Sequence, residues 1–244
     1  MKKIIASLFV LSILFIGCEK DITTEDISTI TNYVTFSFDD TSEKDQLGNN
    51  KLIIEKGTPY DVAEHFSATE GSEDVTDRAE IDGTIDVNTP GYYPIHYSAV
   101  NADGYSAGVT KGIFVSDPDF TTDISGSYTA TVYRTPTGET FTEGFPVNIT
   151  LITNGNFYIN RLLGSYYYDG FGYSSSGSYF VHGFVALHPD NTLTHGASFS
   201  PAWQDTLEGE GIVDGSYDPD SGVITYGALY AGGRTFHVTL TPNF

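Results

Sequence analysis

Short stretches of alternating apolar and polar residues run along most of the chain, separated by turn-forming residues. The clearest is 147–151, where Val, Ile and Leu alternate with Asn and Thr. Such alternation predicts a strand with one buried and one solvated face. Long stretches with apolar residues three and four positions apart are absent, so the pattern predicts no helix.

The first β region extends from about residue 33 to 115. Its predicted strands are separated by Gly, Pro, Asn and Asp turn sequences, a spacing typical of a small antiparallel sandwich. The strand-like segments are 33–38, 52–54, 92–100 and 112–115.

A second β region follows a predicted linker at 117–123, where Pro118 and acidic residues interrupt the pattern. Turns at Asn154-Gly155, 189–191 and 217–222 connect its segments, which indicates an antiparallel meander forming a sandwich or barrel-like domain. The expected strands are 127–133, 147–151, 157–159, 179–187 and 236–240. The predicted fold class is therefore all-β.

The beginning of the chain has a different pattern. Lys2 and Lys3 precede the apolar run 4–16, which is shorter than the roughly 20 residues of a membrane-spanning helix. We predict a cleaved export signal over 1–17. Residues 14–18 resemble the lipobox of bacterial lipoproteins, although Phe15 stands where leucine is usual. The resemblance implies lipidation of Cys18 and anchoring to a membrane; the alternative is a secreted protein with a stray cysteine.

Residues 18–31 are predicted to form a flexible acidic tether. Lys20-Asp21 resembles the charged export signal of Bacteroidetes lipoproteins, which implies a position on the outer membrane facing the cell exterior. A plain solvated linker explains the same residues equally well.

Composition limits the remaining function classes. With one cysteine, the chain can form no intramolecular disulfide. The formal charge of −21 becomes −23 once residues 1–17, with their two lysines, are removed. This acidity argues against nucleic-acid binding and against attraction to anionic lipid headgroups.

Segments 74–76, 85–97 and 101–104 resemble a bacterial immunoglobulin-like (Ig-like) extracellular domain over roughly 50–117. In that family a Thr-Pro-Gly turn, here 89–91, leads into a strand with core tyrosines. The resemblance implies that 32–117 forms an Ig-like sandwich that acts as a spacer.

The rest of the chain, 118–244, resembles the C-terminal β domain of two-domain Bacteroides surface lipoproteins of unknown function. Some of these lie near starch-utilisation-type glycan uptake systems, which implies glycan-uptake surface proteins as partners. Where that family has a glycine pair, this chain has Gly164-Ser165. The likeness rests on 125–128, 162–167, 170–173, 190–192 and 217–224.

A tyrosine-rich loop, 164–179, is the candidate ligand site. Aromatic rings stack on the apolar faces of sugars, and nearby hydroxyl and carboxylate groups can hydrogen-bond sugar hydroxyls. The alternative is that at least half of its tyrosines point into a β core, as alternation over 165–168 requires. The candidate residues are Tyr166, Tyr167, Tyr168, Asp169 and Tyr173.

Trp203 completes the candidate set. It lies in the loop-like segment 200–205, where an indole can serve as a stacking anchor or as a plug over the end of the domain.

No motif predicts catalysis, a cofactor or a bound metal. Asp218, Asp220 and Asp214 lack the spacing and distant glutamate of a calcium loop, and 218–222 fits a hairpin turn better. The six histidines form no close ligand pair, and neither a nucleophile elbow nor a phosphate loop is present.

Two functions follow as hypotheses. The first is a non-catalytic surface accessory protein that binds a polysaccharide or oligosaccharide through the C-terminal domain. The second is a structural or protein–protein assembly component of the outer-membrane surface. A hydrolase ranks third, since abundant acidic residues alone do not indicate a paired-carboxylate site.

Overall fold

The computed structural model describes residues 31–41, 43–173 and 178–243. The predicted signal, Cys18 and Lys20-Asp21 lie outside this part of the chain. Within it, no helix has the length and apolar character needed to span a membrane.

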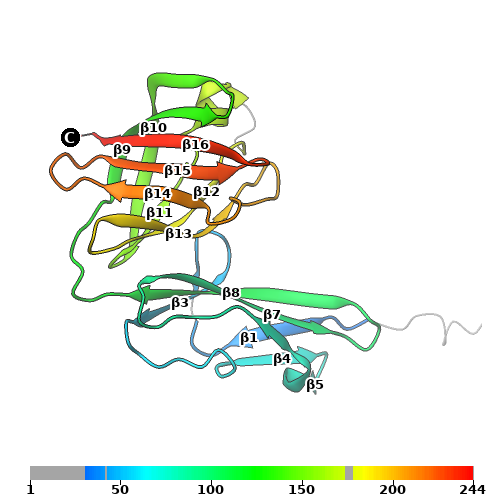
Figure 1. Cartoon of the computed structure of the whole chain (residues 1–244). Coiled ribbons are helices and arrows are strands. Elements are labelled where there is room, and N and C mark those ends of the chain that lie inside the picture. The colour runs from blue at the N-terminus through cyan, green and yellow to red at the C-terminus, as the bar shows by residue number, and fades with distance from the viewer. Residues whose placement is uncertain (1–30, 42, 174–177, 244) are drawn as a thin grey trace, which may run out of the picture. The chain divides into compact units, whose positions relative to one another are not determined.

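The N-terminal part of the structure consists of two β-sheets (Figure 1). The smaller sheet has the order β1-β4-β5, and the larger has the order β2-β3-β8-β7-β6. The smaller contains β1 (Val34–Phe38), β4 (Phe66–Glu70) and β5 (Glu73–Asp74). The larger contains β2 (Glu43–Lys44), β3 (Asn50–Glu55), β6 (Glu80–Asp82), β7 (Gly91–Val100) and β8 (Ser106–Ser116). A short 3-10 turn, η2 (Thr76–Arg78), precedes β6.

The pairing differs from the prediction in one respect. Strand β3 runs parallel to β8, with Asn50 opposite Lys111 and Glu55 opposite Ser116. Parallel strands need a long crossover connection, and residues 56–105 supply it. Local alternation cannot reveal such a pairing, because it reports only which face of a strand is buried.

The C-terminal part is a closed antiparallel barrel of eight strands. Each strand from β9 to β16 pairs with the next, and β16 pairs with β9, so the predicted meander is confirmed and the choice between sandwich and barrel is settled. The strands are β9 (Gly126–Thr135), β10 (Thr140–Thr153), β11 (Asn156–Ile159), β12 (His182–Leu187), β13 (Thr192–Phe199), β14 (Ile212–Tyr217), β15 (Ile224–Tyr230) and β16 (Arg234–Pro242).

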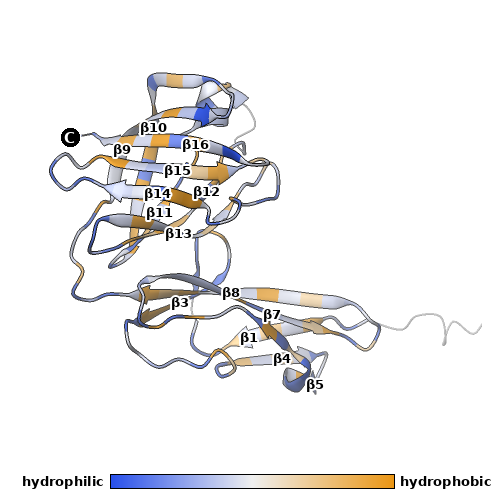
Figure 2. Ribbon diagram, viewed as in Figure 1, coloured by the Kyte–Doolittle hydropathy of each residue, from blue (hydrophilic) through white to orange (hydrophobic). Residues whose placement is uncertain are grey.

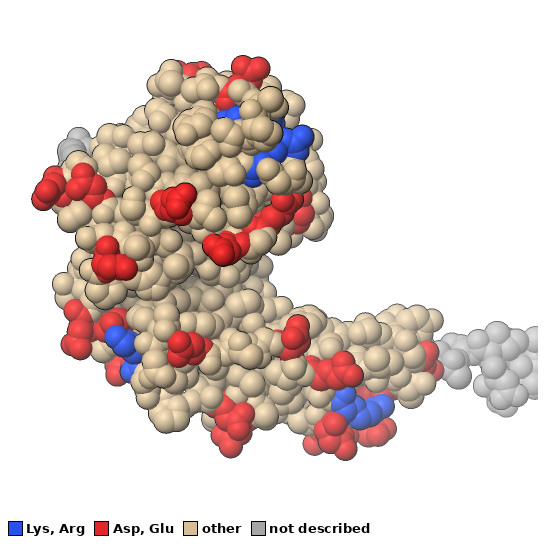
Figure 3. Space-filling view, in the orientation of Figure 1, with Lys and Arg blue, Asp and Glu red and all other residues tan. Residues whose placement is uncertain are grey.

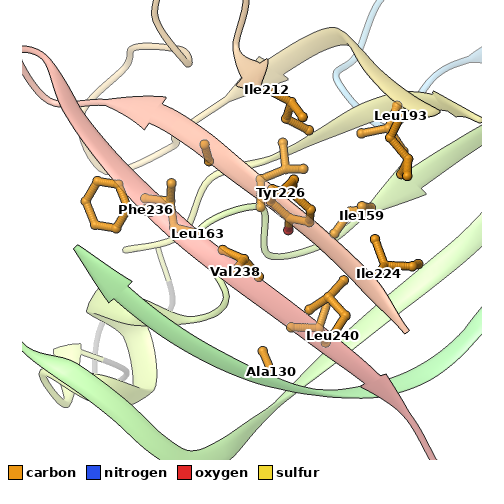
Figure 4. Close-up of a cluster of buried hydrophobic side chains, with 14 of the residues drawn as sticks. Ala130, Ile159, Leu163, Leu193, Ile212, Ile224, Tyr226, Phe236, Val238 and Leu240 are labelled. Atoms are coloured by element: carbon orange, nitrogen blue, oxygen red, sulfur yellow. The ribbon is translucent and has the colours of Figure 1, made fainter. Parts of the chain in front are cut away.

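The barrel is filled by side chains from the inward positions of its strands. In β10, Val147 and Ile149 are buried while Asn148 and Thr150 are exposed, as the alternation predicts. The alternation fails at Leu151, which is exposed and stands at a shift in the pairing of β10 with β11. Figure 4 shows Tyr226, Phe236, Val238 and other members of this cluster between the strands. In Figure 2 the barrel strands carry both apolar and polar positions along their length. Burial of this apolar surface is the main source of the barrel's stability.

The second half of β8 is buried on both faces, since all residues from Lys111 to Ser116 are buried. Ile113 packs into the core between the two N-terminal sheets. Phe114, on the opposite face, packs with Tyr92 and with Phe184 of β12, at ring-centre distances of 4.8 and 4.9 Å. Residues 33–244 form one compact unit, in which these three rings make a buried contact between β7, β8 and β12.

We predict that Phe184→Ala lowers the free energy of unfolding by roughly 3 kcal/mol or more, because it opens a cavity in this aromatic contact. Urea unfolding followed by circular dichroism measures the change. Tyr133→Ala, which removes an exposed ring from the same barrel, is the control and should cost about 0.5 kcal/mol or less. Equal losses for the two variants would contradict the packing described here.

A second prediction concerns His195 of β13. Burial lowers the pKa of His195 to about 4, and its Nε2 is buried with no hydrogen-bond partner among the described residues. Because the folded-state pKa lies below the unfolded value, protons bind the unfolded chain first as the pH falls. The protein should lose roughly 3 kcal/mol of stability from this group between about pH 6.5 and pH 4.

Thermal unfolding across this pH range tests the assignment. His195→Gln should flatten the pH dependence, whereas His96→Gln, which replaces an exposed histidine, should leave it unchanged. An unaltered pH profile for His195→Gln would refute the assignment.

Candidate functional site

Two connections leave the same end of the barrel and bring aromatic residues together (Figure 1). One lies between β11 and β12, and the other lies between β13 and β14. Five aromatic side chains from these connections form a set of ring contacts that we call the aromatic cluster. Its members are Tyr167, Phe171, Tyr173, Tyr179 and Trp203.

A single turn of π-helix, η3 (Tyr166–Gly170), carries the first part of the cluster. The prediction of no helix is wrong here, and so is the alternation expected over 165–168. Gly164 and Ser165 both adopt positive φ values, 58° and 65°, which reverse the chain before the helix. Glycine tolerates this conformation best, so serine at the second position accepts some backbone strain. Its Oγ donates a hydrogen bond to the Asp169 carboxylate.

Tyr166 anchors the helix to the barrel and is not part of the surface. Its side chain is fully buried, and its ring packs on Phe141 and Phe236 at 5.2 and 4.9 Å. The Glu139 backbone N–H donates to the Tyr166 Oη over 3.0 Å. A ring with no exposed surface cannot stack on a ligand. The prediction that Tyr166 belongs to the ligand site is therefore wrong.

The aromatic cluster joins the two connections through direct ring contacts. The Trp203 ring lies 5.1 Å from Tyr167 and 5.3 Å from Tyr179. Tyr173 contacts Tyr179 at 5.3 Å and lies nearly parallel to Tyr167 at 6.3 Å. Two of the predicted tyrosines and the predicted tryptophan are thereby brought to one place, although 36 residues separate Tyr167 from Trp203.

Part of the aromatic cluster faces solvent. Phe171, Tyr173 and Trp203 are 41%, 43% and 37% exposed, while Tyr167 and Tyr179 are half-buried. Contiguous exposed apolar side chains of this kind are uncommon on the surface of a soluble protein. The Trp203 ring lies 5.9 Å from that of Tyr230, and part of the indole remains exposed, so both predicted roles stay open.

Tyr168 and Asp169 lie beside the aromatic cluster but have structural partners. The Arg161 guanidinium lies 3.7 Å from the centre of the Tyr168 ring, a cation–π contact. Asp169 accepts the hydrogen bond from Ser165. Both side chains are half-buried, so they border the surface without forming its centre.

Other carboxylates at this end of the barrel also support local structure. The Tyr230 hydroxyl donates to Asp205 over 2.8 Å, and this bond together with burial raises the pKa of Tyr230. Glu208 accepts the backbone N–H groups of Gly232 and Gly233, which lowers the pKa of its carboxyl. The chemistry that the cluster itself offers is therefore apolar ring faces and phenol hydroxyls.

Phe171, Tyr173 and Trp203 form the exposed part of the aromatic cluster. Carboxylates are spread over the face shown in Figure 3, with few basic groups among them. The barrel's three cations are Arg134, Arg161 and Arg234. Arg134 reaches the hydroxyl of Tyr167, a member of the cluster, at 3.5 Å, and Arg161 covers the ring of Tyr168 beside it.

Sequence reasoning missed Phe171 and Tyr230 and did not commit to Tyr179. Phe171 lies between two glycines in the tyrosine-rich loop, so its position in the sequence could have identified it as a candidate. Tyr230 ends β15, and no local pattern links it to Trp203.

The acidic turn at Asp218 agrees with the predicted hairpin. Its carboxylate accepts the backbone N–H of Asp220 and the hydroxyl of Ser221, and the Gly222 N–H bonds its carbonyl. These bonds occupy the carboxylate within the turn.

Comparison with known proteins gives matches to both parts of the chain. Residues 46–115 match the family model for the Ig-like domain of bacterial surface proteins. Residues 117–242 match a second family model, which describes a C-terminal domain. No curated protein matches the chain.

Among solved structures, the lipoprotein BT2262 from Bacteroides thetaiotaomicron is 31% identical, covering 86% of this chain and all of its own, with a TM-score of 0.43. A Bacteroides ovatus protein of unknown function is 12% identical, covering 86% of this chain and 93% of its own, with a TM-score of 0.22.

A structure of the CBM51-2 and INT domains of Clostridium perfringens ZmpB, with CBM51-2 in complex with GlcNAc, is 14% identical. It covers 45% of this chain and 28% of its own, with a TM-score of 0.25. At that score the likeness carries no argument about the ligand of this chain.

The two matched segments follow the division between the N-terminal sheets and the barrel, and the 31% identity to BT2262 extends over both. The chain therefore belongs to the family of the Bacteroides lipoprotein BT2262, with an N-terminal bacterial surface Ig-like domain and the family's C-terminal domain.

Proposed function

We propose that this protein is a non-catalytic, lipid-anchored surface protein that binds a glycan through the aromatic cluster of its barrel. The observation that carries the proposal is the partial exposure of Phe171, Tyr173 and Trp203 in one contiguous set of ring contacts. Sugar rings have apolar C–H faces that stack on aromatic side chains. Several exposed rings in contact with one another can stack on successive sugars of a polysaccharide chain.

The anchor supports this role. Cys18 would hold the mature chain to the outer membrane facing the cell exterior, and the Ig-like domain would act as a stalk that presents the barrel. A surface protein raised on a tether meets polymers that cannot enter the cell, and other glycan-uptake surface proteins are its expected neighbours.

The second candidate is assembly with another surface protein through the same aromatic cluster. It is favoured by the partial exposure of Phe171, Tyr173 and Trp203, since exposed apolar patches also serve protein contacts. The two proposals use the same residues, those of the aromatic cluster, and differ in whether these bind a glycan or another protein.

We predict that Trp203→Ala and Tyr173→Ala each weaken polysaccharide binding by about tenfold or more, because each removes a partly exposed ring from the surface. Affinity gel electrophoresis against a polysaccharide panel, followed by calorimetry on any positive, measures the loss. Tyr105→Ala is the matched control, because this ring is 53% exposed but lies in the Ig-like domain. No binding by the wild-type protein to any member of the panel would refute glycan binding and leave assembly as the proposal.

The anchor has its own test. Cells expressing the chain should incorporate radiolabelled palmitate into it, and Cys18→Ser should abolish the label because the acylated thiol is gone. Protease added to intact cells should degrade the wild-type protein if it faces the exterior. Label retained in Cys18→Ser, or full protection from protease, would contradict the anchor or its orientation respectively.

A further inference from the structure

The Ig-like domain has a lysine in its interior. The side chain of Lys111, on β8, has no exposed surface, and its Nζ lies 2.5 and 2.7 Å from the two carboxylate oxygens of Asp40. The Tyr60 Oη lies 2.5 Å from this Nζ and donates to Asp40 Oδ2 over 2.7 Å. An amine, a carboxyl and a phenol are thus in mutual contact.

Two aromatic rings lie beside the Lys111 Nζ. The Lys111 Nζ lies 4.9 Å from the centre of the Phe38 ring and 5.2 Å from that of Tyr60. Burial lowers the pKa of Lys111, although Asp40 opposes the shift. A buried ammonium is costly unless it is paired, and the condensation proposed next would begin with transfer of one proton from Lys111 to Asp40.

We propose that Lys111 and Asp40 are joined by an intramolecular amide bond. The neutral Nζ attacks Asp40 Cγ, forming the C–N bond and a tetrahedral intermediate. The proton lost by Nζ passes through the Tyr60 hydroxyl to Oδ2. The Cγ–Oδ2 bond then breaks and one water leaves. The condensation needs no oxidant, reductant or further reactant.

An amide between Asp40 and Lys111 would cross-link the two sheets of the Ig-like domain. Asp40 follows β1, in the smaller sheet, and Lys111 belongs to β8, in the larger sheet, 71 positions along the chain. An amide at this point would link the first and last strands of the domain and hold its two sheets together. A chain with one cysteine cannot obtain such a link from an intramolecular disulfide.

A metal site is the rival use of these residues, because ligand atoms of Asp39, Asp40 and His65 lie within 4.8 Å of one another. Both Asp40 oxygens are engaged by the Lys111 Nζ, however, and Asp39 and His65 are exposed. A cation would have to displace the Lys111 Nζ, which already contacts both Asp40 oxygens.

Peptide mass spectrometry of the purified full chain tests the proposal. With the amide present, trypsin cannot cleave after Lys111, and a branched peptide should join residues 21–44 to 79–134 with a mass about 18 Da below the sum of the two. Lys51, whose Nζ forms a surface ion pair with Glu43 at 2.6 Å, is the internal control and should remain cleavable.

Lys111→Met should abolish the branched peptide, and Tyr60→Phe should slow its accumulation after synthesis. The measurement on the wild-type chain decides the matter even if Lys111→Met fails to fold. Recovery of 21–44 and 79–111 only as linear peptides would overturn the proposal.

Discussion

Pairing of β16 with β9 is the contact on which the C-terminal domain depends. It closes eight antiparallel strands into a barrel and leaves no unpaired strand edge in that sheet. Closure also fixes where the connections emerge, because alternate connections of an up-and-down barrel leave the same end. The segments that carry Tyr167 and Trp203 meet for this reason, and the aromatic cluster is a consequence of the barrel's topology.

The aromatic cluster combines a fixed base with an exposed upper part. Tyr166, buried against Phe236, holds the π-helix to the barrel, and the helix in turn positions Tyr167 against Trp203. Exposed rings gain little from folding, since their surface stays in contact with water. Their retention on a rigid base is easier to explain by a ligand than by stability, and rings already in place lose little freedom on binding.

Much of this architecture could be read from the sequence, because strand alternation and turn chemistry are local properties. The alternation over 147–151 and the Asn154-Gly155 turn predicted β10, β11 and the hairpin between them. The parallel pair β3 and β8 and the closure of the barrel are not local, so no pattern within either strand could show them. Composition identified the tyrosine-rich loop and Trp203 as separate candidates. Their contact could not be predicted, because it depends on the order of the strands.

The burial of individual tyrosines was beyond sequence reasoning for a specific reason. Period-two alternation decides which side chains are buried only where the backbone is extended, and residues 166–170 form a π-helix. Gly164 and Ser165 precede this helix with positive φ values, and nothing in the local alternation indicates that conformation.

Fluorescence of Trp203 during titration with polysaccharide tests the central claim most directly. Trp203 is the only tryptophan in the chain and belongs to the aromatic cluster, so its emission reports on that surface alone. A glycan that stacks there should shift the emission to shorter wavelength and saturate at the affinity measured by calorimetry. A polysaccharide that binds by calorimetry while leaving the Trp203 emission unchanged would contradict the claim.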